Sequence, residues 1–149
     1  MTRAHKLSLS VQYASASSSL PARAQLRRWV TAGLGRAAQV TLRIVDEAEG
    51  RELNRNYRGK DYATNVLTFV YDDEAPLAGD IVLCSPVVER EAQEQRKELD
   101  AHYAHLVIHA VLHLQGYEHD REKDASEMEA LETAIMAKLG YPDPYAVTS

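Results

Sequence analysis

The sequence predicts an α+β fold: a single domain in which a small mixed β-sheet of about four strands packs against helices. Two observations lead to this expectation. Up to Cys84, short strand-like runs alternate with helical patterns, whereas the chain after Ser85 has helical patterns throughout. The length of 149 residues suits one hydrophobic core, so residues 1–149 are expected to form one domain.

Four short runs have the alternation, or the β-branched and aromatic content, that is typical of strands. Leu7–Tyr13 alternates apolar and polar residues, as a half-buried strand does. The expected strands are Leu7–Tyr13, Gln39–Asp46, Val66–Tyr71 and Gly79–Cys84. An acidic loop, Asp72–Ala78, would join the last two.

Five segments have helical periodicity. Ser85 is expected to be the N-cap of the third helix, with Pro86 at its first helical position. Gly116 and Gly140 are expected to end the last two helices. The expected helices are Pro21–Leu34, Glu47–Tyr57, Ser85–Lys97, Leu99–Leu114 and Lys123–Leu139.

Charge is distributed unevenly along the chain. The net charge is −5, but residues 1–71 hold 11 Lys and Arg against 5 Asp and Glu, whereas residues 72–149 hold 6 against 17. An acidic half suits a metal cation and a basic half suits a phosphate chain, although two solvated faces without a partner would give the same counts. No apolar run approaches the roughly 20 residues of a membrane span. The single cysteine, Cys84, fits a reducing cytoplasm.

Three histidines have the spacing of a metal site. His109 and His113 are four residues apart on an expected helix, so their imidazoles lie on one face. Gly116 then ends the helix, and His119 follows three residues later, within reach of the same ion. Three imidazoles with one open position are typical of catalytic zinc, because structural zinc normally has four protein ligands. We expect one Zn²⁺ per chain, although three imidazoles also accept other first-row metals.

The spacing H-x-x-x-H-x-x-G-x-x-H is that of a class of zinc peptidases, but one residue does not fit. Ala110 stands where such a peptidase has the glutamate that accepts a proton, and a methyl group cannot do so. Glu118 and Asp120, on either side of His119, are candidates for a proton acceptor, or else for acids that only orient the ligands or face solvent. His105 could contact substrate in the cleft, or could be a hydrogen-bonded structural histidine.

A basic turn, Arg58-Gly59-Lys60-Asp61, precedes the third expected strand. The guanidinium of Arg58 would offer two fixed donors to a phosphate and neutralise charge that develops on a phosphoryl oxygen. Lys60 is a second candidate for phosphate binding. A solvated basic loop is the alternative.

These residues resemble the YbeY family of bacterial rRNA maturation endoribonucleases. The most specific stretch is AHLVIHAVLHLQGYEHD, residues 104–120. The other similar stretches are Leu53–Asp61, Thr64–Phe69, Gly79–Ile81 and Glu127–Glu132. Ala110, Glu118 and Val70 stand where the family usually has glycine, aspartate and proline, and none of these differences removes a ligand.

The resemblance implies a zinc-dependent, single-strand-specific endoribonuclease acting in 3′-end maturation of small-subunit rRNA and in ribosome quality control. It implies His109, His113 and His119 as zinc ligands, Arg58 as a catalytic arginine, and a zinc-peptidase-like metal helix. A metal-activated water would attack a backbone phosphate. The implied partners are single-stranded precursor rRNA and the small ribosomal subunit with its proteins, in the cytoplasm. A peptide hydrolase and a ribosome assembly factor with structural zinc remain open as alternatives.

Overall fold

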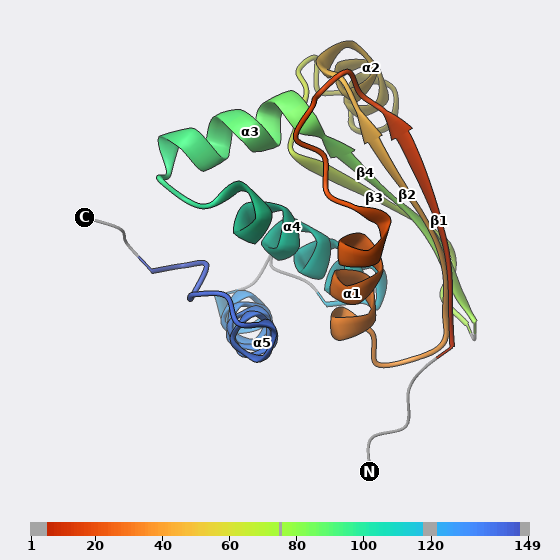
Figure 1. Ribbon diagram of the computed structural model, residues 1–149. Coiled ribbons are helices and arrows are strands. Elements are labelled where there is room, and N and C mark those ends of the chain that lie inside the picture. The colour runs from red at the N-terminus through yellow and green to blue at the C-terminus, as the bar shows by residue number, and fades with distance from the viewer. Residues whose placement is uncertain (1–5, 75, 118–121, 147–149) are drawn as a thin grey trace.

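The computed structural model describes residues 6–74, 76–117 and 122–146. Its centre is a mixed four-stranded sheet in the order β1-β2-β4-β3 (Figure 1). β1 (Leu7–Ala14), β2 (Ala38–Val45) and β4 (Leu77–Cys84) are parallel, and β3 (Val66–Asp72) is antiparallel to β4. β1 and β3 are therefore the two edges of this sheet.

Helices cover both faces of the sheet. α1 and α4 lie side by side on one face, and α5 packs against the outer side of α4 (Figure 1). α2 packs against β4 from the other face, and α3 adjoins both α2 and α4. The helices are α1 (Arg23–Gly33), α2 (Glu47–Arg58), α3 (Ser85–Glu94), α4 (Leu99–Leu114) and α5 (Glu122–Leu139).

Two hydrophobic cores follow from this layering. The larger core joins the sheet to α1, α4 and α5, with Trp29, Tyr103 and Met136 among its fully buried side chains. The smaller core lies on the α2 face and includes Leu67 and Cys84, with Leu53 and Phe69 at its margin. Cys84 is buried, and burial raises the pKa of its thiol. The strands thus bury side chains on both faces, which holds α4 and α2 on opposite sides of the sheet.

The predicted α+β fold is confirmed, and most boundaries differ from the expected ones by only a few residues. α3 differs most, because it ends at Glu94 rather than at Lys97. Arg96 has a left-handed φ of 54°, which a helix cannot continue through. Ser85 is also not the N-cap: it is the first helical residue, and its buried hydroxyl donates to the carbonyl of Val45. Gly116 and Gly140 do follow α4 and α5, at φ values of 99° and 91°.

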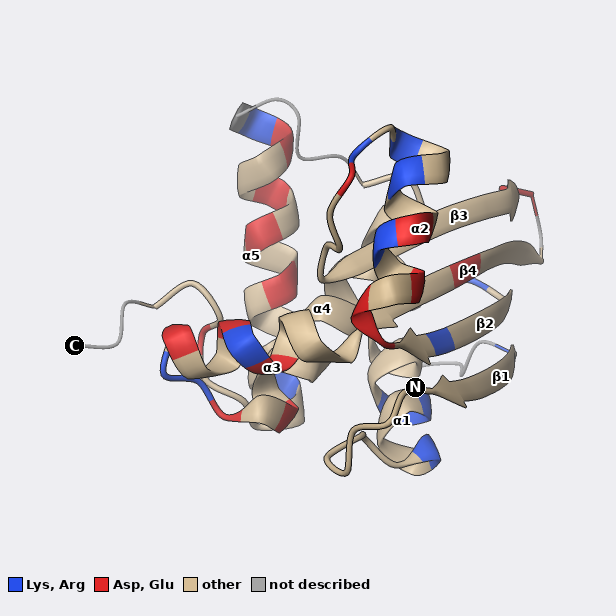
Figure 2. Cartoon of the chain, turned by 90° about the horizontal axis from the view of Figure 1, so that it is seen from above, with Lys and Arg blue, Asp and Glu red and all other residues tan. Residues whose placement is uncertain are grey.

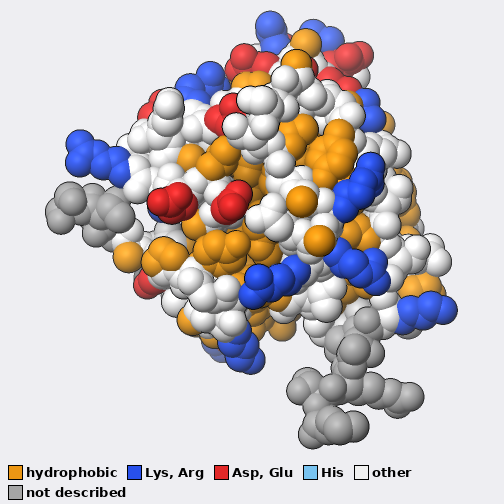
Figure 3. Space-filling model, in the orientation of Figure 1, with side chains coloured by type: hydrophobic (Ala, Val, Ile, Leu, Met, Phe, Trp, Pro, Cys, Tyr) orange, Lys and Arg blue, Asp and Glu red, His pale blue; other side chains and the backbone are white. Residues whose placement is uncertain are grey.

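Within the described ranges, no helix is both long enough and apolar enough to span a bilayer. Charge follows the pattern seen in the sequence: basic residues lie at the end of α2 and on α1, and acidic residues recur along α5 (Figure 2). On the face seen in Figure 3, hydrophobic side chains gather over the middle of the molecule and most Lys and Arg side chains lie nearer its rim.

Gly79 of β4 marks a place where only glycine fits. A Cβ at this position would lie 2.7 Å from the carbonyl oxygen of Phe69 on β3 and 2.9 Å from Leu114 Cδ2 of α4. We therefore expect Gly79→Ala to lower the free energy of unfolding by about 1–3 kcal/mol, the usual cost of overpacking. Denaturant unfolding measures this. Gly35→Ala is the control, since its nearest neighbour is Gln115 Oε1 at 3.5 Å. Equal stability of the two variants would contradict the close approach.

Glu91 joins three elements through hydrogen bonds. His102 Nε2 of α4 lies 2.9 Å from Glu91 Oε1 of α3, and the side-chain amide of Asn65, just before β3, donates to the same carboxylate at 3.1 Å. His102 is only 4% exposed. Burial by itself would raise the pKa of Glu91, but these hydrogen bonds outweigh it and hold the pKa below its usual value near 4.5.

We expect Glu91→Gln to destabilise the protein by about 1.5–3 kcal/mol near neutral pH, because a partly buried hydrogen bond to a charged group is lost. A lowered pKa stabilises the fold above the unfolded-state value and loses that contribution as the pH falls through the folded-state value. The gap between variant and wild type should therefore shrink below about pH 4.5. Urea unfolding from neutral to acidic pH measures the gap, and exposed Glu94→Gln is the control. A gap that stays constant with pH would count against the ionised carboxylate.

Candidate metal centre and basic turn

α4 is almost entirely buried except for a stripe of histidines. Ile108, Ala110 and Leu112 pack in the larger core, whereas His109 and His113 are only partly buried. The spacing of four residues places both imidazoles on one helix face, where they could hold a metal ion. Ala110 is fully buried, so its side chain belongs to the core and not to the exposed stripe.

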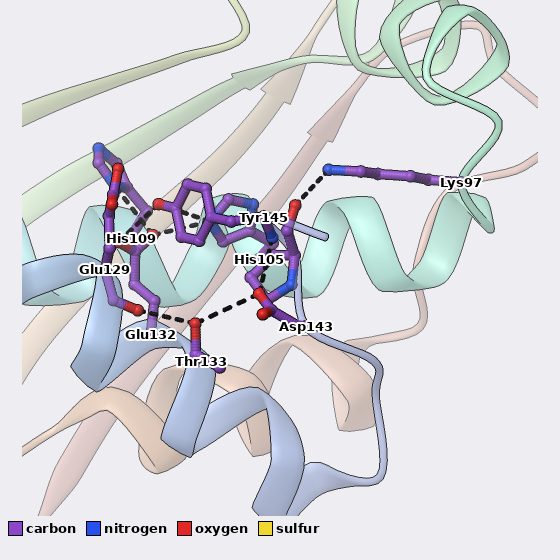
Figure 4. A network of polar contacts seen from close by, with 9 residues as sticks. Lys97, His105, His109, Glu129, Glu132, Thr133, Asp143 and Tyr145 are labelled. Carbon is purple, nitrogen blue, oxygen red and sulfur yellow. Dashed lines mark hydrogen bonds and ion pairs between the residues drawn. The ribbon is translucent and has the colours of Figure 1, made fainter. Parts of the chain in front are cut away.

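A buried carboxylate of α5 faces this stripe (Figure 4). Glu132 is 0% exposed, and its Oε1 lies 3.1 Å from His109 Nδ1 and 2.7 Å from His105 Nε2. A hydrogen bond from His109 Nδ1–H makes Nε2 the ring nitrogen that would bind a metal. Carboxylates in this position usually fix the tautomer and orientation of metal-binding histidines.

The C-terminal segment completes the environment of Glu132. The hydroxyl of Tyr145 donates to Glu132 Oε2 at 2.8 Å, and its ring packs edge-on to His105 at 5.1 Å. Lys97 Nζ, in the loop that leads into α4, donates to the carbonyl of Pro144 at 2.6 Å (Figure 4). The segment is thereby held against α4 and α5 at the level of the histidines.

The charge state of Glu132 follows from these contacts. Burial opposes its ionisation, but hydrogen bonds from His105, His109 and Tyr145 outweigh burial and lower the pKa of the carboxyl to about 2. The pKa of Tyr145 is raised well above its usual value. Burial is the first cause, and the hydrogen bond to the Glu132 carboxylate is the second. Glu132 is therefore a fixed negative charge beside the histidine stripe at neutral pH, as a cation site requires.

His105 makes the contacts of a hydrogen-bonded histidine. Besides Glu132, its Nε2 lies 3.3 Å from the hydroxyl of Tyr145. Its side chain is 12% exposed. The hydrogen-bonded histidine that the sequence left open is thus seen, and contact of His105 with substrate stays a prediction.

The remaining predicted metal-site residues fall in a short gap. Glu118, His119 and Asp120 lie in residues 118–121, outside the described part of the chain. Among the residues that are described, no three His, Cys, Asp or Glu side chains come together as a complete metal site. His109 and His113, with Glu132 behind His109, are the part of the predicted centre that can be described.

The basic turn begins at the C-terminal end of α2. Arg58 is the last residue of α2, and Gly59 caps the helix in the left-handed conformation at φ 71°. Buried Asn54 holds the turn from inside, because its side-chain amide donates to the carbonyl of Tyr62 at 2.7 Å. Arg51 is paired in two hydrogen bonds with Asp61. Arg58 and Lys60 are exposed, and neither belongs to an ion pair found among the described residues.

Sequence reasoning missed the roles of Glu132 and Tyr145. A signal for Glu132 was present: Met128, Glu132 and Met136 recur every four residues on the buried face of α5. A glutamate between two buried methionines needs hydrogen-bond donors. In the fold, His105, Tyr145 and His109 supply them. Tyr145 gave no such signal, since it follows a non-helical segment with two prolines.

The known proteins that this chain is similar to carry one family name. The family described as "Endoribonuclease YbeY" matches residues 12–140. A protein of that name from Nitrosomonas europaea is 59% identical over 142 residues, covering 95% of this chain and 87% of its own length. One from Aromatoleum aromaticum is 57% identical over 148 residues, covering 97% and 96%.

A solved structure supports the fold. The solution structure of TM1509 from Thermotoga maritima superposes with a TM-score of 0.56 at 25% identity, covering 93% of this chain and 99% of that one. The family match spans both the histidine stripe and the basic turn, and the identity to curated relatives is high along almost the whole chain. The chain therefore belongs to the endoribonuclease YbeY family, as the resemblance in sequence indicated.

Proposed function

We propose that this protein is a zinc-dependent endoribonuclease that hydrolyses single-stranded RNA, in the cytoplasm, during maturation of the 3′ end of small-subunit rRNA. The observation that carries the proposal is the buried Glu132 carboxylate against His109, one helical turn from His113. Family membership supports phosphodiester hydrolysis as the reaction.

The donor set fits zinc. Neutral imidazole nitrogens are common zinc ligands, and a carboxylate on the far ring nitrogen is the usual support for one. His109, His113 and His119 would hold the ion and leave a position open for water. When bound, zinc would supply an acidified water and a positive charge.

Each residue of the proposed site then has a role. Glu132 accepts a hydrogen bond from Nδ1–H of His109, which orients the ring so that Nε2 would be the nitrogen that binds the metal. Arg58 would bind the phosphate with two parallel donors, and its charge cannot be lost by deprotonation. Lys60 would bind a neighbouring phosphate. Glu118 and Asp120 remain candidates for the proton acceptor. The small ribosomal subunit, with its proteins, is the proposed place where this substrate is met.

Glu132→Gln tests the metal centre without measuring activity. Removing the charge behind His109 should weaken zinc binding about 10- to 100-fold, the usual cost of losing such a partner. Competition with a chromophoric chelator measures the affinity. Glu129→Gln, an exposed acid one turn earlier on α5, should bind zinc like wild type. Unchanged affinity in Glu132→Gln would show that the carboxylate does not orient a ligand.

Cleavage of a single-stranded RNA by zinc-loaded protein tests the activity. His113→Ala should lose cleavage together with zinc, and Arg58→Ala should lose about 10²- to 10³-fold in rate while keeping zinc, because a donor to the developing charge is removed. Arg28→Ala on α1 is the control for the loss of one surface arginine. If His113→Ala and Arg58→Ala both cut like wild type, the activity comes from a contaminant.

Two results would favour the alternative functions, a peptide hydrolase or an assembly factor. Peptide cleavage that is lost on chelation and insensitive to Arg58→Ala would indicate a peptide hydrolase. Full rescue of a deletion strain by His113→Ala, at normal protein levels, would indicate an assembly factor in which zinc is structural.

A further inference from the structure

Three aromatic side chains form a ledge on the α2 face of the β3 edge: Tyr57, Phe69 and Tyr71. Tyr57 of α2 meets Phe69 of β3 edge-to-face, with ring centroids 4.9 Å apart and planes at 66°. Phe69 lies partly buried on the smaller core. Tyr57 and Tyr71 are 67% and 70% exposed, which is unusual for two large rings so close together.

Tyr71 is fixed in this ledge by a hydrogen bond. Its hydroxyl donates to Asp80 Oδ2 at 2.6 Å, and Asp80 is the register partner of Phe69 on β4. This hydrogen bond, with burial, raises the pKa of Tyr71 to about 12, and Tyr57 is near enough to contribute. The hydroxyl of Tyr71 is thus engaged within the protein, and its ring surface is what it offers to solvent.

The aromatic ledge adjoins the basic turn. Tyr57 immediately precedes Arg58, and Arg55 shares the last turn of α2 with them. Since Asp61 is already engaged by Arg51, the nearest carboxylate of the turn does not neutralise Arg58 or Lys60. Exposed rings beside unneutralised cations are the composition of surfaces that bind single-stranded nucleic acid.

β3 links this surface to the histidines. It is an edge strand of the described sheet, and it contacts α4 on one face while Phe69 supports Tyr57 on the other. A chain crossing this edge could touch both the aromatic ledge and the metal helix. A duplex keeps its bases stacked inside and cannot offer them to the rings.

We propose that Tyr57 and Tyr71 stack on unpaired bases of the RNA and so make this face the part of the protein that recognises single strands. The inference rests on the proposed RNA substrate but concerns binding, not hydrolysis. It assigns the preference for single strands to two tyrosines outside the histidine stripe and outside the basic turn.

The test is binding of the zinc-loaded full-length protein to a fluorescein-labelled RNA of about 12 nucleotides, within the usual site sizes of such surfaces. Fluorescence anisotropy gives the Kd, and a gel after each titration checks that the RNA is intact. The comparison strands are an abasic ribose-phosphate chain of equal length and the same RNA in a duplex.

Tyr57→Leu and Tyr71→Leu should each weaken binding of the base-bearing strand about 5- to 150-fold and leave binding of the abasic strand unchanged. Leucine keeps an apolar contact on Phe69 but has no ring face. Tyr57→Phe should bind like wild type, since stacking uses the ring. Tyr13→Leu is the control, an exposed tyrosine on the opposite edge strand β1.

Two outcomes would overturn the inference: equal losses on the abasic and base-bearing strands, or no loss in either leucine variant. Failure of the proposed activity has a different signature. If base-dependent binding needs Tyr57 but no RNA is cut, the aromatic ledge stands and the endoribonuclease assignment fails. If RNA is cut at wild-type rate and affinity by Tyr57→Leu, the endoribonuclease assignment stands and the aromatic ledge fails.

Discussion

The buried carboxylate of Glu132 is the constraint on which the candidate site depends. A carboxylate removed from water is strongly unfavourable unless donors surround it. Here the donors are His105, His109 and Tyr145, from α4 and the C-terminal segment. Satisfying one buried charge therefore ties α5, α4 and the C-terminal segment together. The orientation of His109 follows from this requirement, because turning its ring away would leave Glu132 short of a donor.

The sheet imposes a second constraint through its edge. β3 is antiparallel to β4, so its first residue lies beside the end of β4. β4 is its only partner in the described sheet, so the other side of β3 (Val66–Asp72) is an edge. Gly79 lets Leu114 of α4 approach the sheet where β3 and β4 meet. α4 and the end of α2 flank this strand from opposite faces.

Local patterns in the sequence were sufficient for the elements but not for the contacts between them. Periodicity predicted the four strands and five helices seen in the described residues, since alternation and the 3.6-residue repeat depend on burial, which the cores impose. The end of α3 was missed because Arg96 adopts a left-handed conformation that its residue type does not announce. The placement of His109 and His113 on one helix face was predicted from their spacing alone. The contact of His109 with Glu132 spans 23 residues and depends on how α5 packs on α4, which no local pattern encodes.

The uneven charge of the chain acquires a physical meaning once the fold is known. The acidic half becomes α5 and its surroundings, and the basic half becomes α1 and the end of α2 (Figure 2). On the proposed function, the phosphate chain is attracted to the α2 side and repelled by α5, so the two helices would confine it to the β3 edge between them. A confined backbone leaves its bases to turn outward or onto a neighbouring surface, and the aromatic ledge is the apolar surface at that edge. The charge separation and the exposed tyrosines then serve the same end: the first positions the backbone, and the second accepts only bases that are not already paired.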